Sequence, residues 1–271
     1  MSQQQLDFER NWLAKLSHGL DEIAGEDIRN EVMKGCERLS SQSSCDEVIA
    51  WSKQAMERMD SLVKHEDKRR AVMTGCACQY PKAQLKEIKK TYEETGDIGL
   101  VHQMLQEQFE SFLKDTLQLD DRLVEEIVSR AWGSAGVKEG NTVIATKIPK
   151  SGYLFEYMRE TDPERKRQLY CHCPRVRDVL KTSETISPTY CYCGAGFYKG
   201  IWEEILQKPV EVEVLQSVLK GDNVCKIAVY LPSDRELRCA EGNPNAVVGM
   251  TRSARPASEV TVRIRRSKYA H

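Results

Sequence analysis

The chain has 271 residues, of which 40% are hydrophobic and 30% charged, a composition typical of a globular protein with a buried core. Its 40 Lys and Arg nearly cancel its 41 Asp and Glu, so no net field draws it onto nucleic acid or an anionic membrane surface. The first residues lack an apolar signal segment, and no later stretch approaches the roughly 18 apolar residues of a membrane helix. These features predict a cytoplasmic protein with neither a membrane nor a nucleic-acid partner. In that reducing compartment the ten cysteines should be thiols, metal ligands or catalytic groups and not disulfides.

Residues 1–137 are predicted to form an all-helical domain. Between residue 6 and about residue 132, apolar residues recur at intervals of three and four, for example at Trp12, Leu16 and Leu20. This spacing gives each helix one apolar face, which would be buried against its neighbours.

Residues 138–232 are predicted to form an α+β domain. Five short segments carry the apolar or β-branched residues of strands, and they are 142–146, 169–173, 189–193, 210–214 and 224–229. A helix is expected over residues 195–206. Residues 233–271 are polar and basic, which predicts a weakly structured tail, although the alternating run at 260–264 could form one edge strand.

Two Cys-x-Cys pairs, Cys171/Cys173 and Cys191/Cys193, are the most informative residues of the chain. In extended strands residues i and i+2 point to the same side, so pairing of the two predicted strands would bring four thiols together. Four thiolates satisfy the tetrahedral geometry of zinc or another soft metal. Inert core cysteines are the alternative, because cysteine is among the most readily buried residue types.

A third pair, Cys76-Ala77-Cys78, falls in the predicted helical domain. On a helix its two thiols would lie on different faces, so this pair contributes to a metal site only if the segment is a loop. No other local feature assigns it a function.

Cys225 is predicted to be a core cysteine. A symmetric turn at residues 220–223 pairs Val218 with Cys225 and places Cys225 on the buried face of its strand. A bulge would instead turn it towards Glu211 and Glu213, where a thiolate and a carboxylate could share a metal.

Cys193 is the best candidate nucleophile, because it precedes a Gly-Ala-Gly segment at the start of a predicted helix. Backbone N–H groups exposed by the glycines could form an oxyanion hole, and the helix N-terminus favours a thiolate. His172 is the nearest candidate base. The alternative is that the glycines only make a tight turn and that His172 faces solvent.

Basic residues outnumber acidic ones between residues 142 and 181. Lys147 and Lys150 could cradle an anion, and Arg175 or Arg177 could clamp a carboxylate or phosphate. Solvated surface charge is the alternative explanation for all four residues.

The segment from Cys193 to Gly200, residues 209–214 and the Gly-Asp-x-x-Cys hairpin that ends at Cys225 resemble the C-terminal part of 4-vinyl-reductase-type small-molecule-binding domains. The chain is also similar to L-2-amino-thiazoline-4-carboxylic acid hydrolase-like proteins, and its whole length resembles an uncharacterised cysteine-rich prokaryotic family. The first resemblance implies an antiparallel sheet packed with helices, and a cavity for small hydrophobic or aromatic compounds near a structural zinc.

That resemblance also implies particular metal ligands. Cysteines and one acid hold the zinc in the sensor proteins, which would assign Cys225 together with Glu211 or Glu213. This chain departs from the pattern at two positions. Ser217 stands where the zinc-binding sensors carry a cysteine, and Ile227 replaces the aromatic residue that often follows the last cysteine.

The sequence therefore predicts a small-molecule-binding protein whose zinc-type site, drawn from Cys171, Cys173, Cys191, Cys193 and Cys225, lies beside the ligand cleft. The ligand would be small and anionic or aromatic. An alternative is a cysteine-dependent hydrolase that acts on a small carboxylate-bearing substrate. A third is an interaction module with inert thiols, and the sequence leaves a homodimer open.

Overall fold

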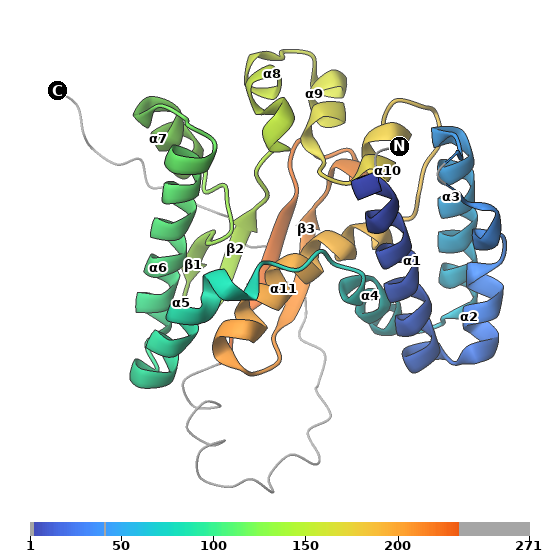
Figure 1. Ribbon diagram of the computed structural model, residues 1–271, viewed down its shortest axis with the longest axis horizontal. Helices are drawn as coiled ribbons and strands as arrows, with labels where there is room; N and C mark the ends of the chain where they lie inside the picture. Colours follow the sequence, from blue (N-terminus) through green and yellow to red (C-terminus); the bar gives the residue numbers. More distant parts are fainter. Residues whose placement is uncertain (1–2, 41, 233–271) are drawn as a thin grey trace, which may run out of the picture. The chain divides into compact units, whose positions relative to one another are not determined.

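The helices predicted from the spacing of apolar residues in the first half of the chain are confirmed. The computed structural model describes residues 3–40 and 42–232, with side chains from residue 9 onward, and the predicted tail at 233–271 lies outside the described residues. The helices before the first strand are α1 (Gln3–Ala24), α2 (Glu26–Met33), α3 (Cys45–Leu62), α4 (Glu66–Gly75), α5 (Lys82–Thr95), α6 (Ile98–Ser111) and α7 (Asp121–Ser129). With the sheet of the second half they make an α+β fold (Figure 1).

Side-chain caps fix where several helices begin. Ser44 starts α3 with a capping box, in which its hydroxyl accepts the Glu47 N–H at 3.2 Å and the Glu47 carboxylate accepts the Ser44 N–H at 2.7 Å. Asp97 and Asp120 cap α6 and α7 by accepting backbone N–H groups at 3.0 and 2.8 Å. These boundaries therefore follow from local sequence.

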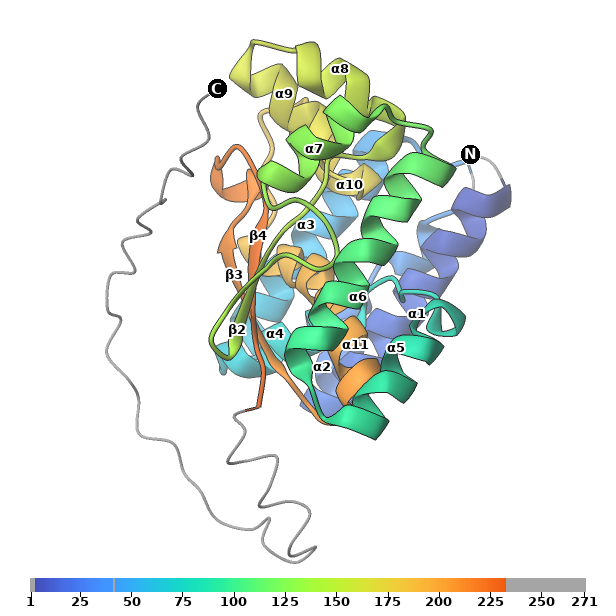
Figure 2. The same cartoon turned by 90° about the vertical axis from the view of Figure 1, so that its left-hand side faces the viewer.

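The sheet has four antiparallel strands in the order β1-β2-β4-β3. Its strands are β1 (Val137–Glu139), β2 (Thr142–Thr146), β3 (Glu211–Gln216) and β4 (Lys226–Tyr230). Three of the five predicted strands are confirmed, and β1 is an addition. Figure 2 shows β2, β3 and β4 side by side, with helices gathered beside them.

The β3–β4 register differs from the symmetric turn predicted from the sequence. Val212 pairs with Val229 and Val214 with Ile227, and a bulge follows Val214. A 3₁₀ turn at Val218–Lys220 lengthens the connection. Because the pairing is displaced by two residues, which preserves the faces of the strands, Cys225 is still buried, with 8% of its surface exposed.

The predicted strands at 169–173 and 189–193 are wrong. Their places are taken by the end of α9 (Pro163–Tyr170), a loop into α10 (Pro174–Val179), a 3₁₀ turn at Pro188–Cys191 and the start of α11 (Tyr192–Leu206). A further helix, α8 (Leu154–Arg159), precedes α9. Proline stands at the start of α9, α10 and the 3₁₀ turn, where its fixed φ and missing N–H suit a first helical position.

Helix α11 is the centre of the described unit. It packs on β3 and β4 and is also contacted by α4 and α5 (Figure 1). Its Ile201, Trp202 and Ile205 are fully buried. Residues up to Pro232 form one compact unit, in which helices that precede residue 137 share a core with α11. No helix within the described ranges is long and apolar enough to cross a membrane.

Candidate functional site

The second Cys-x-Cys pair opens α11, and its two thiols point apart. Cys191 precedes α11 with helical backbone angles (φ −69°, ψ −13°), and Cys193 lies in the first turn. The Cys191 sulfur lies 2.9 Å from the Ser217 hydroxyl, whereas the Cys193 sulfur donates to the Cys76 carbonyl at 3.5 Å. The expectation that this pair shares a face is therefore wrong, because residues i and i+2 of a helical turn face nearly opposite sides.

The first Cys-x-Cys pair lies in the loop between α9 and α10, and its thiols also have different partners. Arg177 holds this loop by donating to the carbonyls of Cys171 at 2.7 Å and His172 at 2.9 Å. The buried Cys171 sulfur accepts the Cys173 N–H. The Cys173 sulfur lies 3.6 Å from the Tyr190 hydroxyl. Both pairs are thus divided between two environments.

One thiol of each pair meets Cys225 beside Lys147. The thiols of Cys171, Cys191 and Cys225 interact electrostatically with one another and with the Lys147 ammonium. The Tyr170 hydroxyl joins the segments, because it donates to the Lys147 carbonyl and accepts the Cys225 N–H at 3.0 Å. We call Cys171, Cys191, Cys225 and Lys147 the Lys147 cluster. Its thiols come from three segments that are well separated in the sequence.

The Lys147 ammonium is enclosed by protein, although the residue as a whole is only half-buried. A Cβ placed on Gly194 would lie 3.8 Å from Nζ, so the ammonium rests against the first turn of α11. In the part of the chain that the structure describes, Lys147 forms no ion pair with a carboxylate. Burial lowers the pKa of Lys147, whereas ionised Cys171 and Cys225 thiolates and the Tyr198 phenolate raise it more. Thiolates at these positions would therefore hold the Lys147 side chain as a cation.

Burial is the largest influence on the pKa values of the thiols. It raises the pKa of Cys171 and of Cys193 to about 12, and it raises the pKa of Cys191 and of Cys225 above the usual value. At neutral pH these thiols are protonated, so they are weak nucleophiles until another cation takes the place of the proton.

The thiol groups of the Lys147 cluster are of the type that binds a soft metal, but they are not arranged as metal ligands in this structure. Among residues 9–40 and 42–232, no three His, Cys, Asp or Glu side chains are arranged to hold a metal ion. Glu213, implied as a ligand by the resemblance, accepts the Tyr230 hydroxyl at 2.7 Å, and Glu211 is exposed on β3. Ser217 is fully buried, and its hydroxyl lies 2.9 Å from the Cys191 sulfur.

The structure gives His172 and Cys193 different partners. His172 is an exposed residue whose Nε2 lies 2.9 Å from the Ile148 carbonyl, and partial desolvation of the ring together with the nearby Lys147 lowers its pKa. The Cys193 sulfur accepts the Trp12 N–H and donates to a carbonyl. This arrangement lacks the hydrogen bond from nucleophile to base that activates a thiol.

The candidate anion-binding residues are engaged in packing. Arg175 is 2% exposed and stacks over the Trp12 ring, 4.2 Å from its centroid. Arg177 holds the carbonyls of the α9–α10 loop, and Lys150 lies over a tyrosine ring. Lys150 and Arg177 both lie over the Tyr153 ring, whereas Lys147 is enclosed among thiols.

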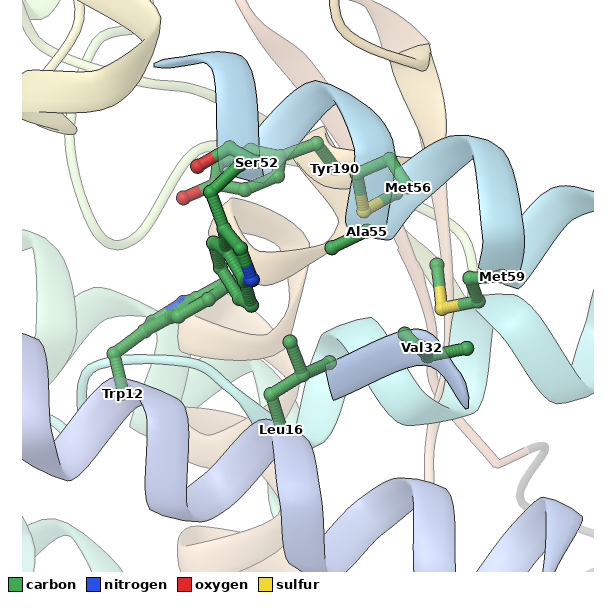
Figure 3. A pocket seen from close by; sticks show the side chains of 9 residues that line it. Trp12, Leu16, Val32, Ser52, Ala55, Met56, Met59 and Tyr190 are labelled. Carbon is green, nitrogen blue, oxygen red and sulfur yellow. The ribbon is translucent and has the colours of Figure 1, made fainter. Parts of the chain in front are cut away.

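An apolar cavity lies between α1, α2 and α3 (Figure 3). Its lining residues are Trp12, Leu16, Val32, Trp51, Ser52, Ala55, Met56, Met59 and Tyr190. The space between these side chains is at no point wide enough for a water molecule, so a ligand enters only if side chains move. Trp12 and Tyr190 connect the cavity with the thiols, since they contact Cys193 and Cys173. Sequence reasoning missed it because its wall is built from separate segments.

The comparisons with known proteins identify one similarity. Residues 153–235 match DUF6144, a family of unknown function. No curated protein and no solved structure matches the chain. The matched segment covers less than a third of the chain and includes Cys171, Cys173, Cys191, Cys193 and Cys225, whereas Lys147 and the Cys76-Ala77-Cys78 segment lie before it. All that this establishes is a similarity of residues 153–235 to the DUF6144 family.

Proposed function

We propose that the protein binds a small molecule and that a soft metal ion of the zinc type, held by the thiols of Cys171, Cys191 and Cys225, organises the binding region. The observation that carries this proposal is the Lys147 ammonium, which is enclosed by protein and faces thiols with no carboxylate partner among the described residues. A buried cation without a counter-charge is costly, so the site is incomplete as a set of neutral thiols.

A bound metal would supply that counter-charge. A divalent ion bound by three thiolates carries one net negative charge, which balances the Lys147 ammonium. The first turn of α11 adds N–H groups and the positive end of the helix dipole. The donor set fits a soft metal in kind, while three thiolates leave the fourth tetrahedral position to water or another donor. Side-chain movements would have to bring the sulfur atoms to bonding distance.

The metal would act as a structural centre. It would tie the α9–α10 loop, the start of α11 and the beginning of β4 to one point, because Cys171, Cys191 and Cys225 stand in those three places. The free energy of metal binding would then contribute directly to the free energy of folding.

The cavity between α1, α2 and α3 is the proposed place of the small molecule. Its wall is mostly apolar, the Ser52 hydroxyl donates to the Val48 carbonyl at 2.7 Å, and the Tyr190 hydroxyl accepts a hydrogen bond from Arg175. The buried Trp51 Nε1 has no hydrogen-bond partner among the described residues. The occupant should therefore be apolar or aromatic. Met56 and Met59 have flexible side chains that can move aside to open the space.

Metal analysis tests the proposed centre. Protein purified without chelator should contain bound zinc, and the Cys171→Ser, Cys225→Ser double variant should contain one equivalent less than the wild type. Cys45→Ser is the matched control, because Cys45 is an exposed cysteine on α3. An unchanged metal content in the double variant would refute the assignment.

The Lys147→Met variant tests the charge argument. Removal of a buried cation that lacks a counter-charge should stabilise the metal-free protein, by on the order of 1 kcal/mol, in urea unfolding. The same substitution should weaken metal binding in competition with a chelator, because it removes the charge that balances the thiolates. A variant that loses stability without metal, or binds metal as tightly as the wild type, would contradict the argument.

A further inference from the structure

The Cys76-Ala77-Cys78 segment is a loop. Helix α4 ends at Gly75, Cys76 follows as its C-terminal cap, and residues 77–80 have no regular structure. From the sequence, this pair could contribute to a metal site only if it lay in a loop, and it does lie in one. Cys76 is buried and Cys78 is exposed.

A close helix contact carries this loop to the start of α11. A Cβ added to Gly196 would lie 2.8 Å from the Ala77 Cβ and still closer to the Thr74 carbonyl. Only a glycine allows α11 to approach the end of α4 at this distance. The contact places the loop next to Cys193, which follows Cys191 in the first turn of α11.

Four thiols lie around this contact, although no three of them are arranged as metal ligands in the described residues, and the Cys76 thiol donates to the Val72 carbonyl at 3.3 Å. The Cys193 sulfur donates to the Cys76 carbonyl at 3.5 Å. It also interacts electrostatically with the thiols of Cys76, Cys78 and Cys173. We call Cys76, Cys78, Cys173 and Cys193 the loop cluster.

One hydrogen-bond donor, and one hydroxyl that can donate or accept, lie beside the sulfur atoms of the loop cluster. The Trp12 N–H donates to the Cys193 sulfur, and the Tyr190 hydroxyl lies 3.6 Å from the Cys173 sulfur. Donors of this kind orient thiolate ligands and stabilise their charge. Neutral core thiols need no such partners.

Two cations stand beside the loop cluster. The Lys15 ammonium donates to the Ala77 carbonyl at 2.7 Å, and both Lys15 and Arg175 interact electrostatically with the Cys76 thiol. Arg175 pairs with Glu9 and donates to the Tyr190 hydroxyl at 3.3 Å, while its buried Nε has no hydrogen-bond partner in the described part of the chain. The local charge is therefore positive and favours thiolates.

We propose that Cys76, Cys78, Cys173 and Cys193 hold a second soft metal ion, separate from the one assigned to the Lys147 cluster. Each Cys-x-Cys pair of the second half then gives one thiol to each ion. Every thiol that binds releases one proton to solvent, and no electron transfer is involved. The exposed Cys78 side chain would turn inward to close the site. The inference extends the proposed function from one thiolate centre to two.

Alkylation of the wild-type chain tests the second ion without any substitution. Reduced, metal-free protein should react with iodoacetamide at Cys78, and saturation with Zn²⁺ should slow that reaction at least tenfold. Cys45, which is exposed on α3 and distant in sequence from both clusters, serves as the internal control and should react equally with and without Zn²⁺. Equal reactivity of Cys78 in the two states would overturn the proposal.

Metal content distinguishes the two centres. The wild type should bind two equivalents of Zn²⁺ and the Cys76→Ser, Cys78→Ser variant one, with the Cys36→Ser, Cys45→Ser variant as the control that keeps both. If the Cys76/Cys78 variant binds as much as the wild type, the second ion is refuted and the first is untouched. If it loses one equivalent while the Cys171/Cys225 variant loses none, the loop cluster stands and the Lys147 cluster is refuted.

Discussion

Burial and the nearby Lys147 charge shift the pKa of each thiol of the candidate site in opposite directions. Burial is the larger effect and raises the pKa of Cys171 and of Cys193 to about 12, while the Lys147 cation lowers both. A thiol in this balance stays protonated in neutral solution, yet it stands among cations and N–H groups that favour the thiolate once its proton is replaced. The residues are therefore better suited to holding a metal ion than to attacking a substrate.

The rate of alkylation of Cys193 measures this balance. In metal-free protein at pH 7.5, burial keeps the thiolate fraction of Cys193 small, so iodoacetamide should modify it roughly a hundredfold or more slowly than the exposed Cys78. Because the pH lies below its raised pKa, the rate should increase about tenfold for each pH unit between pH 7 and 9. Mass spectrometry of timed samples gives both rates. A Cys193 that reacts faster than Cys78 would favour the hydrolase alternative.

At the scale of elements, α11 decides where the thiols lie. Its first turn carries Cys191 and Cys193 to opposite sides, one towards Ser217 after β3 and the other towards the end of α4. Gly196 permits the close approach of α4, and it lies on the same helix as both cysteines. A change in this single helix contact would therefore alter the loop cluster more than the Lys147 cluster.

Two glycines of α11 form a matched pair for testing this contact. Gly196→Ala should destabilise the protein by about 1–3 kcal/mol, because the added methyl group meets Ala77 and the Thr74 carbonyl. Gly200→Ala, on the same helix with nothing within 4 Å, should stabilise it by up to ~1 kcal/mol through higher helix propensity. Urea unfolding of both variants measures the two free energies. A tolerated Gly196→Ala would mean that α4 and α11 lie farther apart.

At the scale of the whole molecule, the two halves expected from the sequence share one core. Helices α4 and α5 of the first half pack on α11 of the second, and the proposed loop cluster draws ligands from both. The cavity wall likewise joins Tyr190 to residues of α1, α2 and α3. Stability of either half should therefore depend on the other.

Denaturant unfolding of the full chain should follow a single transition over the described unit. Trp12 and Trp51 report on the first half and Trp202 on α11, so tryptophan fluorescence and far-ultraviolet circular dichroism should give the same midpoint. Single-tryptophan variants would assign the signal to each half. Two separated transitions would show that residues 1–137 and 138–232 unfold as independent domains.

The sequence predicted those elements that local interactions fix. The spacing of apolar residues gave the helices of the first half, and alternation or β-branching gave β2, β3 and β4. It failed at the Cys-x-Cys segments, because short apolar runs do not distinguish a strand from a helical turn. Pro174 and Pro188 were the signals that could have identified helix starts there.

The sequence by itself determined the α+β class, the buried position of Cys225 and the concentration of thiols in the second half of the chain. Only the tertiary structure decided which thiols are neighbours, that Lys147 lies among them without a carboxylate, and that the Cys76-Ala77-Cys78 loop reaches α11. The physical reason is that periodicity and capping act over a few residues, whereas the position of a side chain relative to distant segments depends on packing across the whole core.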